Sequence, residues 1–363
     1  MNINQLTQKY VIKKVFCEED NYRLILAHHK QTGLAVIIKE LNPNAPNIVM
    51  VAKEFERECS LVRRIAAVEC KNIIETYEIS PSNNFYVMEY AEHHSLANYI
   101  AAGNVVSEEI ALDIIIKIAE ALNLLQNNFQ ILHRDVQPKS ILLDKKLQPK
   151  LAGFGIIKSQ DSAQLTIMNE VKGSFFHLAP ELIYSEGDYS IQSDIYGLGL
   201  TFFFTLQGKH LFDRPDTILN FVQTGQLPTS FKSLENRRFA KIIFQMLARN
   251  PQDRIASYPI LLKELRALQQ SMGYMPSVFE WRPRTSNTPK EQSTQSRGEE
   301  QIESLKLNLN DLIKLIKNFK ENILYLEKFQ HHAVAVNALK KELNDLIRIT
   351  KNFRQRILEL ENN

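Results

Sequence analysis

The sequence predicts an α+β protein with a small β-rich lobe, a larger helical lobe and a separate helical tail. Three observations support this prediction. Short β-rich runs alternate with turn residues from residue 10 to about 90, apolar residues at helical spacing dominate from residue 107, and a heptad pattern follows residue 300. The chain has 363 residues, of which 44% are apolar and 23% charged, so it is long enough to bury a substantial core.

The β-rich lobe is expected to contain a hairpin, a helix and a further strand. The hairpin strands are predicted at residues 22–27 and 34–41, and the turn between them ends at Gly33. A helix is predicted at about 47–67, because apolar residues recur there at spacings of three and four. They are Val51, Phe55, Cys59, Val62 and Ile65. Residues 85–90 predict the further strand.

The helical lobe is expected to begin at Ser107. With Glu109 and Ile110 this residue forms the pattern of a helix start, and residues 110–125 are dense in apolar side chains. The pattern stays mainly helical as far as about residue 270. We therefore expect a single two-lobed domain at residues 10–270.

Residues 271–300 are expected to form a disordered linker, because Pro, Ser, Thr, Gln and charged residues replace apolar ones there. Residues 301–361 predict two helical heptad repeats, arranged as a coiled coil or a helical hairpin. Their seam positions follow alternating spacings of four and three over 305–326 and 339–360, and all of them are apolar except Thr350. The two blocks are offset by 34 residues, one short of five heptads, so two helices with a break near 330–336 fit better than one continuous coiled coil.

The apolar seam of the tail, within residues 305–360, is expected to bind a partner helix. That helix belongs either to a second copy of the chain, which would be self-association, or to another protein, which the sequence does not identify. A further alternative that stays open is that the tail packs on the domain of its own chain.

Composition excludes several classes of function. Lys and Arg (44) nearly balance Asp and Glu (41), so the net charge of +3 does not suggest a nucleic-acid partner. The N-terminus lacks a signal-peptide pattern and no apolar run is long enough to span a bilayer, so we expect no membrane contact and a cytoplasmic location. Cys17, Cys59 and Cys70 lack metal-binding spacing and are expected to be reduced thiols.

Glycine is scarce, and its positions are informative. Only 12 residues are glycine, about 3% against a typical 7% or so, and none precedes Gly33. The phosphate-binding patterns G-x-G-x-x-G and G-x-x-x-x-G-K-[ST] do not occur. A glycine-loop nucleotide site in its standard form is therefore excluded.

A series of short motifs nevertheless occurs in order between residues 36 and 254. They are Val36-Ile37-Ile38-Lys39, Phe55-Glu56-Arg57-Glu58, Val87-Met88-Glu89-Tyr90, His133-Arg134-Asp135, Gly153-Phe154-Gly155, Ala179-Pro180-Glu181, Ser193-Asp194-Ile195-Tyr196-Gly197 and Asp253-Arg254. In these motifs the chain resembles the eukaryotic-type Ser/Thr protein kinases, as a degenerate member. The resemblance implies a bilobal protein-kinase-like fold over residues 10–270.

The resemblance also implies roles for the matching residues. Lys39 looks like the ATP-binding lysine, with Glu58 as its partner on the helix. The nucleotide-site residues that it implies are Lys39, Glu58, Met88, Glu89, Tyr90 and Leu142. The catalytic-loop residues are His133, Arg134 and Asp135, with Asp135 as the general base. The alternative, which we favour from the residues alone, is structural: the ion pair holds the helix against the sheet, and His133 and Asp135 brace the loop.

Several positions depart from the kinase pattern at the nucleotide site. Cys17, Glu19 and Tyr22 replace the three glycines of the loop that covers the phosphates, and adjacent carboxylates in this loop oppose anionic ligands. Ile37 replaces the alanine that contacts adenine and is expected to obstruct the site.

The metal-binding positions depart as well. Gly153 and Ser140 replace the two metal ligands of the family; a glycine offers no ligand atom, and a hydroxyl is a weak ligand for a hard cation. Gln137 replaces a lysine that contacts the transferred phosphoryl group. The loss of one such group commonly lowers the rate by about 10²- to 10³-fold. We therefore expect no metal site, no Mg²⁺ and no cofactor, while ATP binding stays open.

The sequence thus predicts a pseudokinase, a catalytically impaired kinase-like protein that acts as a scaffold or allosteric binding module and assembles through its tail. The alternative is a weak or metal-atypical Ser/Thr protein kinase that transfers the γ-phosphate of ATP to protein hydroxyls. A third possibility makes the tail the working part of the chain. Arg134 is also a candidate to bind a phosphate on Ser159, Ser162 or Thr166, although a solvated loop residue is the commoner case.

Overall fold

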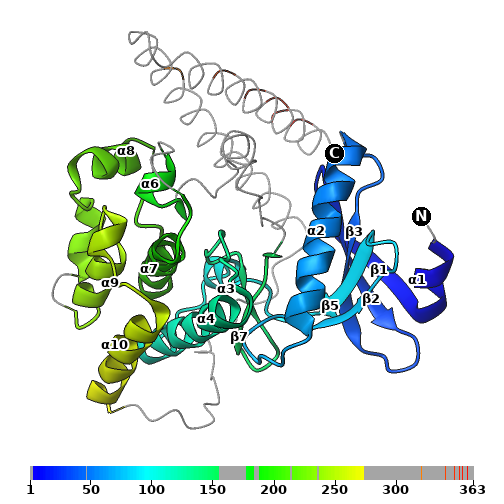
Figure 1. The fold of residues 1–363 in the computed structure, drawn as a ribbon, viewed down its shortest axis with the longest axis horizontal. Helices are drawn as coiled ribbons and strands as arrows, with labels where there is room; N and C mark the ends of the chain where they lie inside the picture. The colour runs from blue at the N-terminus through cyan, green and yellow to red at the C-terminus, as the bar shows by residue number, and fades with distance from the viewer. Residues whose placement is uncertain are drawn as a thin grey trace. The chain divides into compact units, whose positions relative to one another are not determined.

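The structure, a computed structural model, describes residues 3–45, 47–154, 177–183, 188–212, 215–234 and 237–273, and six single positions after residue 300 (Figure 1). The chain divides into two units, residues 1–282 and 283–363, and the helices and strands described all belong to the first unit. The predicted tail lies outside the described residues except at those six positions. The predicted linker lies outside them except at residues 271–273.

The first lobe contains a five-stranded antiparallel sheet in the order β1-β2-β3-β5-β4. Its strands are β1 (Tyr10–Glu18), β2 (Tyr22–His29), β3 (Ala35–Leu41), β4 (Thr76–Ile79) and β5 (Phe85–Glu89). The predicted hairpin is formed by β2 and β3, and Gly33 in its turn has a φ of 70°, which favours glycine. Pairing of Leu24 with Lys39 and of Tyr22 with Leu41 sets the register of this hairpin.

The predicted helix is α2 (Ile48–Ala66), and its apolar residues are buried as expected. Phe55 of α2 packs against Tyr86 of β5, with ring centroids 6.1 Å apart, so α2 covers the face of the sheet that carries Tyr86. Glu58 is buried on the same helix. Because Glu58 is charged and buried on the apolar face of α2, its carboxylate needs a partner inside the lobe.

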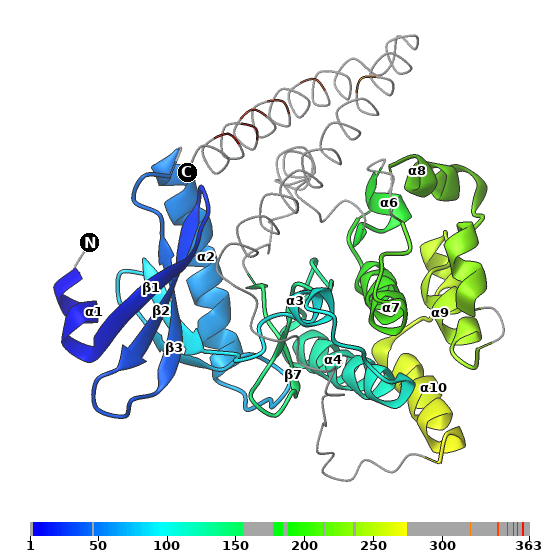
Figure 2. The ribbon, with the colours of Figure 1, turned by 180° about the vertical axis from the view of Figure 1, so that it is seen from behind.

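A short helix that the sequence analysis did not anticipate, α1 (Ile3–Lys9), precedes the sheet. Leu6 of α1 and Tyr10 of β1 belong to a second apolar cluster. The cluster also contains Ile25, Ala27, Val36, Ile38, Phe85 and Val87. Because side chains alternate along a strand, Val87 lies on the face opposite to Tyr86. In both views α1 and α2 lie on opposite sides of the sheet (Figures 1 and 2).

The second lobe is mainly helical, as predicted. Its elements are α3 (Leu96–Ala101), α4 (Glu108–Phe129), the hairpin of β6 (Ile141–Leu143) and β7 (Pro149–Leu151), α6 (Pro180–Ile183), α7 (Ile191–Gln207), α8 (Pro215–Thr224), α9 (Ala240–Met246) and α10 (Tyr258–Ser271), with two 3₁₀ turns at Thr229–Leu234 and Pro251–Asp253. The side chain of Ser107 accepts a hydrogen bond from the backbone N–H of Ile110 at 3.4 Å, which confirms the predicted helix start.

Helix α7 lies in the centre of this lobe, and its residues 193–205 are all buried. Two glycines allow it to pack closely against its neighbours. A Cβ atom at Gly197 would lie 2.6 Å from the backbone oxygen of Val136, and one at Gly199 would lie 2.9 Å from the Cβ of Met246. The backbone of α7 therefore touches the segment that follows Asp135.

In the described part of the chain no helix is both long and apolar enough to cross a membrane. The three cysteines form no disulfide. Together the sheet lobe and the helical lobe confirm the predicted α+β architecture.

Candidate functional site

The first cluster of interest surrounds Lys39 on β3. Its Nζ donates a hydrogen bond to Glu58 Oε1 at 2.6 Å, and both side chains are largely buried. The hydroxyl of Tyr86 donates to the same carboxylate oxygen at 2.7 Å. Burial and the carboxylate hold the pKa of Tyr86 well above its usual range, so Tyr86 remains a protonated donor. The structure thus brings together the lysine and glutamate that the resemblance paired.

Aromatic rings enclose the ammonium of Lys39 on its other sides. Its Nζ lies 4.4 Å from the ring centroid of Tyr22, and 5.9 Å from those of Phe55 and Tyr86. These distances allow cation–π attraction, which is strongest where water is excluded. Tyr22 occupies one of the three positions where the family has glycine. Its ring therefore lies beside the atom that the family uses to bind phosphate.

The other implied nucleotide-site residues lie along β5 and β6. Ile37 is buried on β3, and it pairs in register with Met88 of β5. Glu89, the last residue of β5, forms an ion pair with Lys150 at 2.7 Å, and Lys150 is the register partner of Leu142. Lys150 of β7 is therefore the neighbour of both Glu89 and Leu142.

Tyr90 follows β5 and lies in a contact between the two lobes. The ring of Phe16 on β1 lies 5.3 Å from that of His94, which in turn lies 6.2 Å from the ring of Tyr90. The backbone of Leu143 donates to the His94 carbonyl at 2.8 Å, so this loop is also joined to β6. His94 is exposed, and the sequence analysis did not anticipate its contact with β1.

The catalytic-loop residues form a second cluster, in which both carboxylate oxygens of Asp135 accept hydrogen bonds. Gln137 Nε2 donates to Oδ1 at 2.6 Å, and the hydroxyl of Ser140 donates to Oδ2 at 3.1 Å. Gln137 and Ser140 are two of the residues that depart from the kinase pattern. Both side chains therefore stabilise the carboxylate of Asp135.

Asp194 of α7 holds the beginning of the catalytic loop. The backbone N–H groups of His133 and Arg134 donate to its two oxygens at 2.8 and 2.9 Å. The hydroxyls of Tyr189 and Tyr258 donate to the same carboxylate at 3.0 and 3.2 Å. Burial raises the pKa of Asp194, while the hydrogen bonds that it accepts act in the opposite direction.

His133 itself is fully buried, and its ring nitrogen Nε2 bonds to the carbonyl of Ala152 at 2.9 Å. Burial lowers the pKa of His133, which favours the neutral imidazole. In this environment the histidine supports the loop, and its Nδ1 accepts a hydrogen bond from the backbone N–H of Asp135 at 3.3 Å.

The two positions where the family has metal ligands, 153 and 140, lie close together in this chain. Gly153 has a φ of 91° and no side chain, and a Cβ atom there would lie 3.3 Å from the hydroxyl oxygen of Ser140. Within the described ranges no group of three or more His, Cys, Asp or Glu side chains is arranged to hold a metal ion.

Arg254 and Glu181, which belong to two of the motifs, form an ion pair. Arg254 donates to both carboxylate oxygens of Glu181 at 2.9 and 2.7 Å, and its side chain is fully buried. Ser193 of α7 donates to Glu181 at 2.8 Å as well. This bidentate arrangement connects α6, α7 and the segment before α10.

These features are those of a protein kinase fold, and residues 23–265 match the protein kinase domain. The chain belongs to the protein kinase family, and its β-sheet N-lobe and helical C-lobe are those predicted from the sequence. The predicted resemblance to the Ser/Thr branch is supported by the relatives that follow.

The chain is 31% identical over 211 residues to serine/threonine-protein kinase PrkC of Bacillus subtilis, an alignment that covers 58% of this chain and 32% of that protein. It is 30% identical over 178 residues to a probable serine/threonine-protein kinase, PknB, of Lactococcus lactis, covering 49% and 28%. It is 27% identical over 259 residues to the carbon catabolite-derepressing protein kinase of Secale cereale, covering 69% and 50%. The chain therefore spans between a quarter and a half of the length of these relatives.

Proposed function

We propose that this chain is a pseudokinase, a protein kinase fold that has lost efficient phosphoryl transfer and acts as a scaffold or allosteric binding module. The observation that carries the proposal is the enclosure of Lys39. Its ammonium is paired with Glu58 at 2.6 Å and faces the ring of Tyr22 at 4.4 Å. A phosphate group that approaches Lys39 from the side of Tyr22 displaces this ring, and the displacement gives up an attraction of about 0.5–2 kcal/mol.

The catalytic loop supports the same proposal. Phosphoryl transfer depends on positioning and on neutralising charge with metal ions, a lysine and a base. Gln137 and Ser140 use both oxygens of Asp135, so a substrate hydroxyl competes with two hydrogen bonds for the base. An aspartate restored at position 153 requires a left-handed backbone, which costs about 1–3 kcal/mol for a residue other than glycine.

The proposal extends to the organisation of the chain. The kinase domain occupies residues 10–270, residues 271–300 form a linker, and residues 301–361 form two helical repeats. The seam within 305–360 binds a partner helix or a second copy, and the protein acts in the cytoplasm without nucleic acid, metal or bound cofactor. The heptad spacing of the tail is the support for the assembly role.

One observation favours a second candidate function, that of a weak or metal-atypical Ser/Thr protein kinase. The buried pair of Lys39 and Glu58 is intact, and Asp135 is present at the position of the base. Of the named relatives, one is a Ser/Thr protein kinase and another a probable one. A measurement of phosphate transfer from ATP therefore decides between the two functions.

The experiment uses the full chain with labelled ATP and either Mg²⁺ or Mn²⁺, and it measures phosphate incorporation into the chain itself and into a generic protein substrate. We expect no incorporation above the level of the Asp135→Asn variant. Asp188→Asn serves as the matched control, since Asp188 is exposed and lies outside both clusters. Incorporation that Asp135→Asn abolishes and Asp188→Asn preserves would establish the kinase alternative and overturn the proposal.

A further inference from the structure

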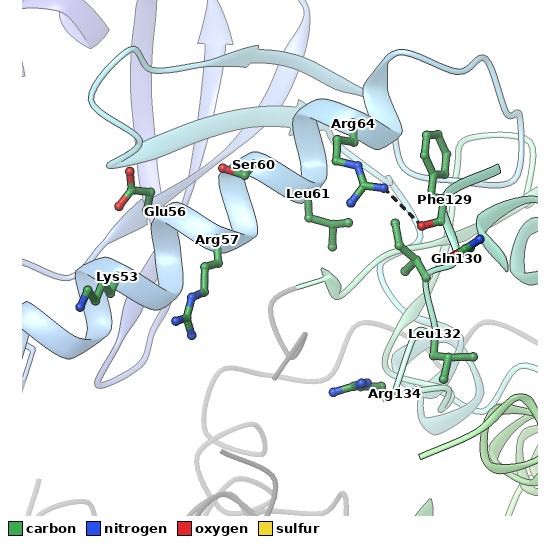
Figure 3. A pocket seen from close by; sticks show the side chains of 11 residues that line it. Lys53, Glu56, Arg57, Ser60, Leu61, Arg64, Phe129, Gln130, Leu132 and Arg134 are labelled. Atoms are coloured by element: carbon green, nitrogen blue, oxygen red, sulfur yellow. Dashed lines mark hydrogen bonds between the residues drawn. The ribbon is translucent and has the colours of Figure 1, made fainter. Parts of the chain in front are cut away.

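A pocket of about 690 Å³ lies between α2 and residues 129–134, on a face of α2 other than the one that carries Glu58. The first wall is formed by α2, with Lys53, Arg57 and Arg64 (Figure 3). The second wall is formed by the end of α4 and the start of the catalytic loop, with Arg134 (Figure 3). Figure 3 shows Arg57 and Arg134 extending into the same space from the two walls.

The side chains of this pocket carry a strong excess of positive charge. Four of its lining residues are Lys or Arg, and Glu56 is the one carboxylate among them. Neither Lys53 nor Arg57 forms an ion pair with any residue that the structure describes. Lys53 and Arg57 are therefore two cations of the pocket without a counterion among the described residues.

Two of the four cations are held in place by other contacts. Arg64 donates to the backbone oxygen of Phe129 at 3.2 Å, and its guanidinium carbon lies 5.7 Å from the centre of the Phe129 ring. The guanidinium of Arg134 lies 5.7 Å from the centre of the Tyr189 ring. Side chains that are positioned before a ligand arrives lose little conformational freedom on binding, which favours affinity.

The basic residues of the pocket share one face of α2, where Lys53 and Arg57 repel each other and Glu54 and Glu56 offset part of that repulsion. Lys53, Arg57 and Arg64 are separated by four and seven residues, so they lie on one face. Like charges four residues apart on a helix repel one another and lower its stability. An anionic ligand in the pocket removes this repulsion.

The floor of the pocket is apolar. Leu61 of α2 and Ile131 of the opposite wall are buried, at 6% and 8% exposure, and both line the pocket. A free phosphate or a nucleic acid backbone makes no use of such a floor. A peptide with carboxylates on either side of one large apolar residue satisfies both the rim and the floor.

From this geometry we infer that the pocket is a docking site for an acidic peptide segment of a partner protein, with an apolar side chain against Leu61 and Ile131 and carboxylates paired with Lys53 and Arg57. The inference names the partner-binding surface of the scaffold proposed above, and it rests on that proposal for its biological purpose. The segment 155–176 of the same chain is a poorer match in charge, because its sequence contains two lysines and two carboxylates.

The test measures the binding of a fluorescent seven-residue probe, Glu-Asp-Glu-Phe-Glu-Asp-Glu, to the full chain by polarisation. We expect saturable binding that weakens as salt rises, because the pairs at the rim are screened. Arg57→Glu is expected to lower the affinity about tenfold or more, since it reverses a charge that faces the ligand. Lys263→Glu is the matched control, because Lys263 is exposed on helix α10, and it is expected to leave the affinity unchanged.

Second probes separate the occupants. Replacing the central Phe by Gly is expected to weaken binding, and equal binding of that probe or of single-stranded DNA would reduce the pocket to a general polyanion surface and overturn the inference. The inference also fails if the purified chain carries phosphate within residues 155–176 and binds the probe only after phosphatase treatment, because the pocket then belongs to that segment. Loss of probe binding contradicts only the docking site, whereas phosphate transfer from ATP contradicts the pseudokinase proposal.

Discussion

Replacing Tyr22 is the most direct test of the enclosed lysine. Tyr22→Ala removes a ring that lies 4.4 Å from the Nζ of Lys39, which costs about 0.5–2 kcal/mol of cation–π attraction. The ring of Tyr22 is also half-buried against the core. Replacing a fully buried aromatic residue by alanine lowers the free energy of unfolding by about 3–5 kcal/mol, so we expect about half of that loss for Tyr22. We expect a total loss of about 2–4 kcal/mol in the free energy of unfolding.

The assay is thermal unfolding of the full chain followed by circular dichroism. A loss of this size lowers the melting temperature by about 5–15 °C in a domain of this length. Tyr22→Phe is the control, because it retains the ring and removes only the hydroxyl, and its melting temperature is expected to stay close to that of the unaltered chain. If the alanine and phenylalanine variants unfold at the same temperature, the ring does not support Lys39 and the reasoning is refuted.

The remaining predictions concern the core of the C-lobe, the catalytic loop and the tail. Gly197→Ala is expected to destabilise the chain by about 1–3 kcal/mol or more in urea unfolding, because its Cβ would lie 2.6 Å from the Val136 oxygen; unchanged stability would contradict the close packing. Burial lowers the pKa of His133, so the unfolded state binds a proton that the folded state does not, and this contribution to stability is lost as pH falls below about 6.5. His133→Gln should therefore show a smaller loss of stability between pH 7.5 and pH 5.5 than the unaltered chain, which parallel urea titrations measure. Ile316→Glu, on the tail seam, is expected to lower the mass measured by light scattering, and Lys314→Glu, off the seam, to preserve it; equal masses for all three proteins would remove the assembly role.

The fold was largely predictable because its elements have strong local patterns. The apolar spacing of α2 and the hairpin turn at Gly33 each specify an element without reference to the rest of the chain. Helix α1 was missed because a helix of seven residues has little periodicity, and its stability comes from the contact of Leu6 with the sheet. Residues 155–176, which include the candidate phosphate-bearing residues Ser159, Ser162 and Thr166, lie outside the described residues.

The candidate site was predictable in its residues but not in their contacts. Motif order was enough to place Lys39, Glu58 and Asp135. The position of Tyr22 beside Lys39 follows from the β2–β3 register, since Leu24 pairs with Lys39 and Tyr22 lies two residues before it on the same face. The register of β2 and β3 is set by the turn and the paired strands together, so it could not be predicted from any single residue. The basic stripe on α2 was visible as spacing, but the wall that faces it comes from a distant part of the chain.

The contact between Asp194 and the catalytic loop gives the motif His133-Arg134-Asp135 a structural role that does not depend on catalysis. The carboxylate is fully buried, and two of its four hydrogen bonds come from the backbone of His133 and Arg134. A loop that moved away would leave a buried charge short of partners, which costs about 3–5 kcal/mol. Selection for a stable C-lobe is therefore sufficient to keep the loop in place. Methods that identify a kinase by the tripeptide His133-Arg134-Asp135 therefore detect residues that the fold itself requires. Such methods will count inactive and active members of the family alike.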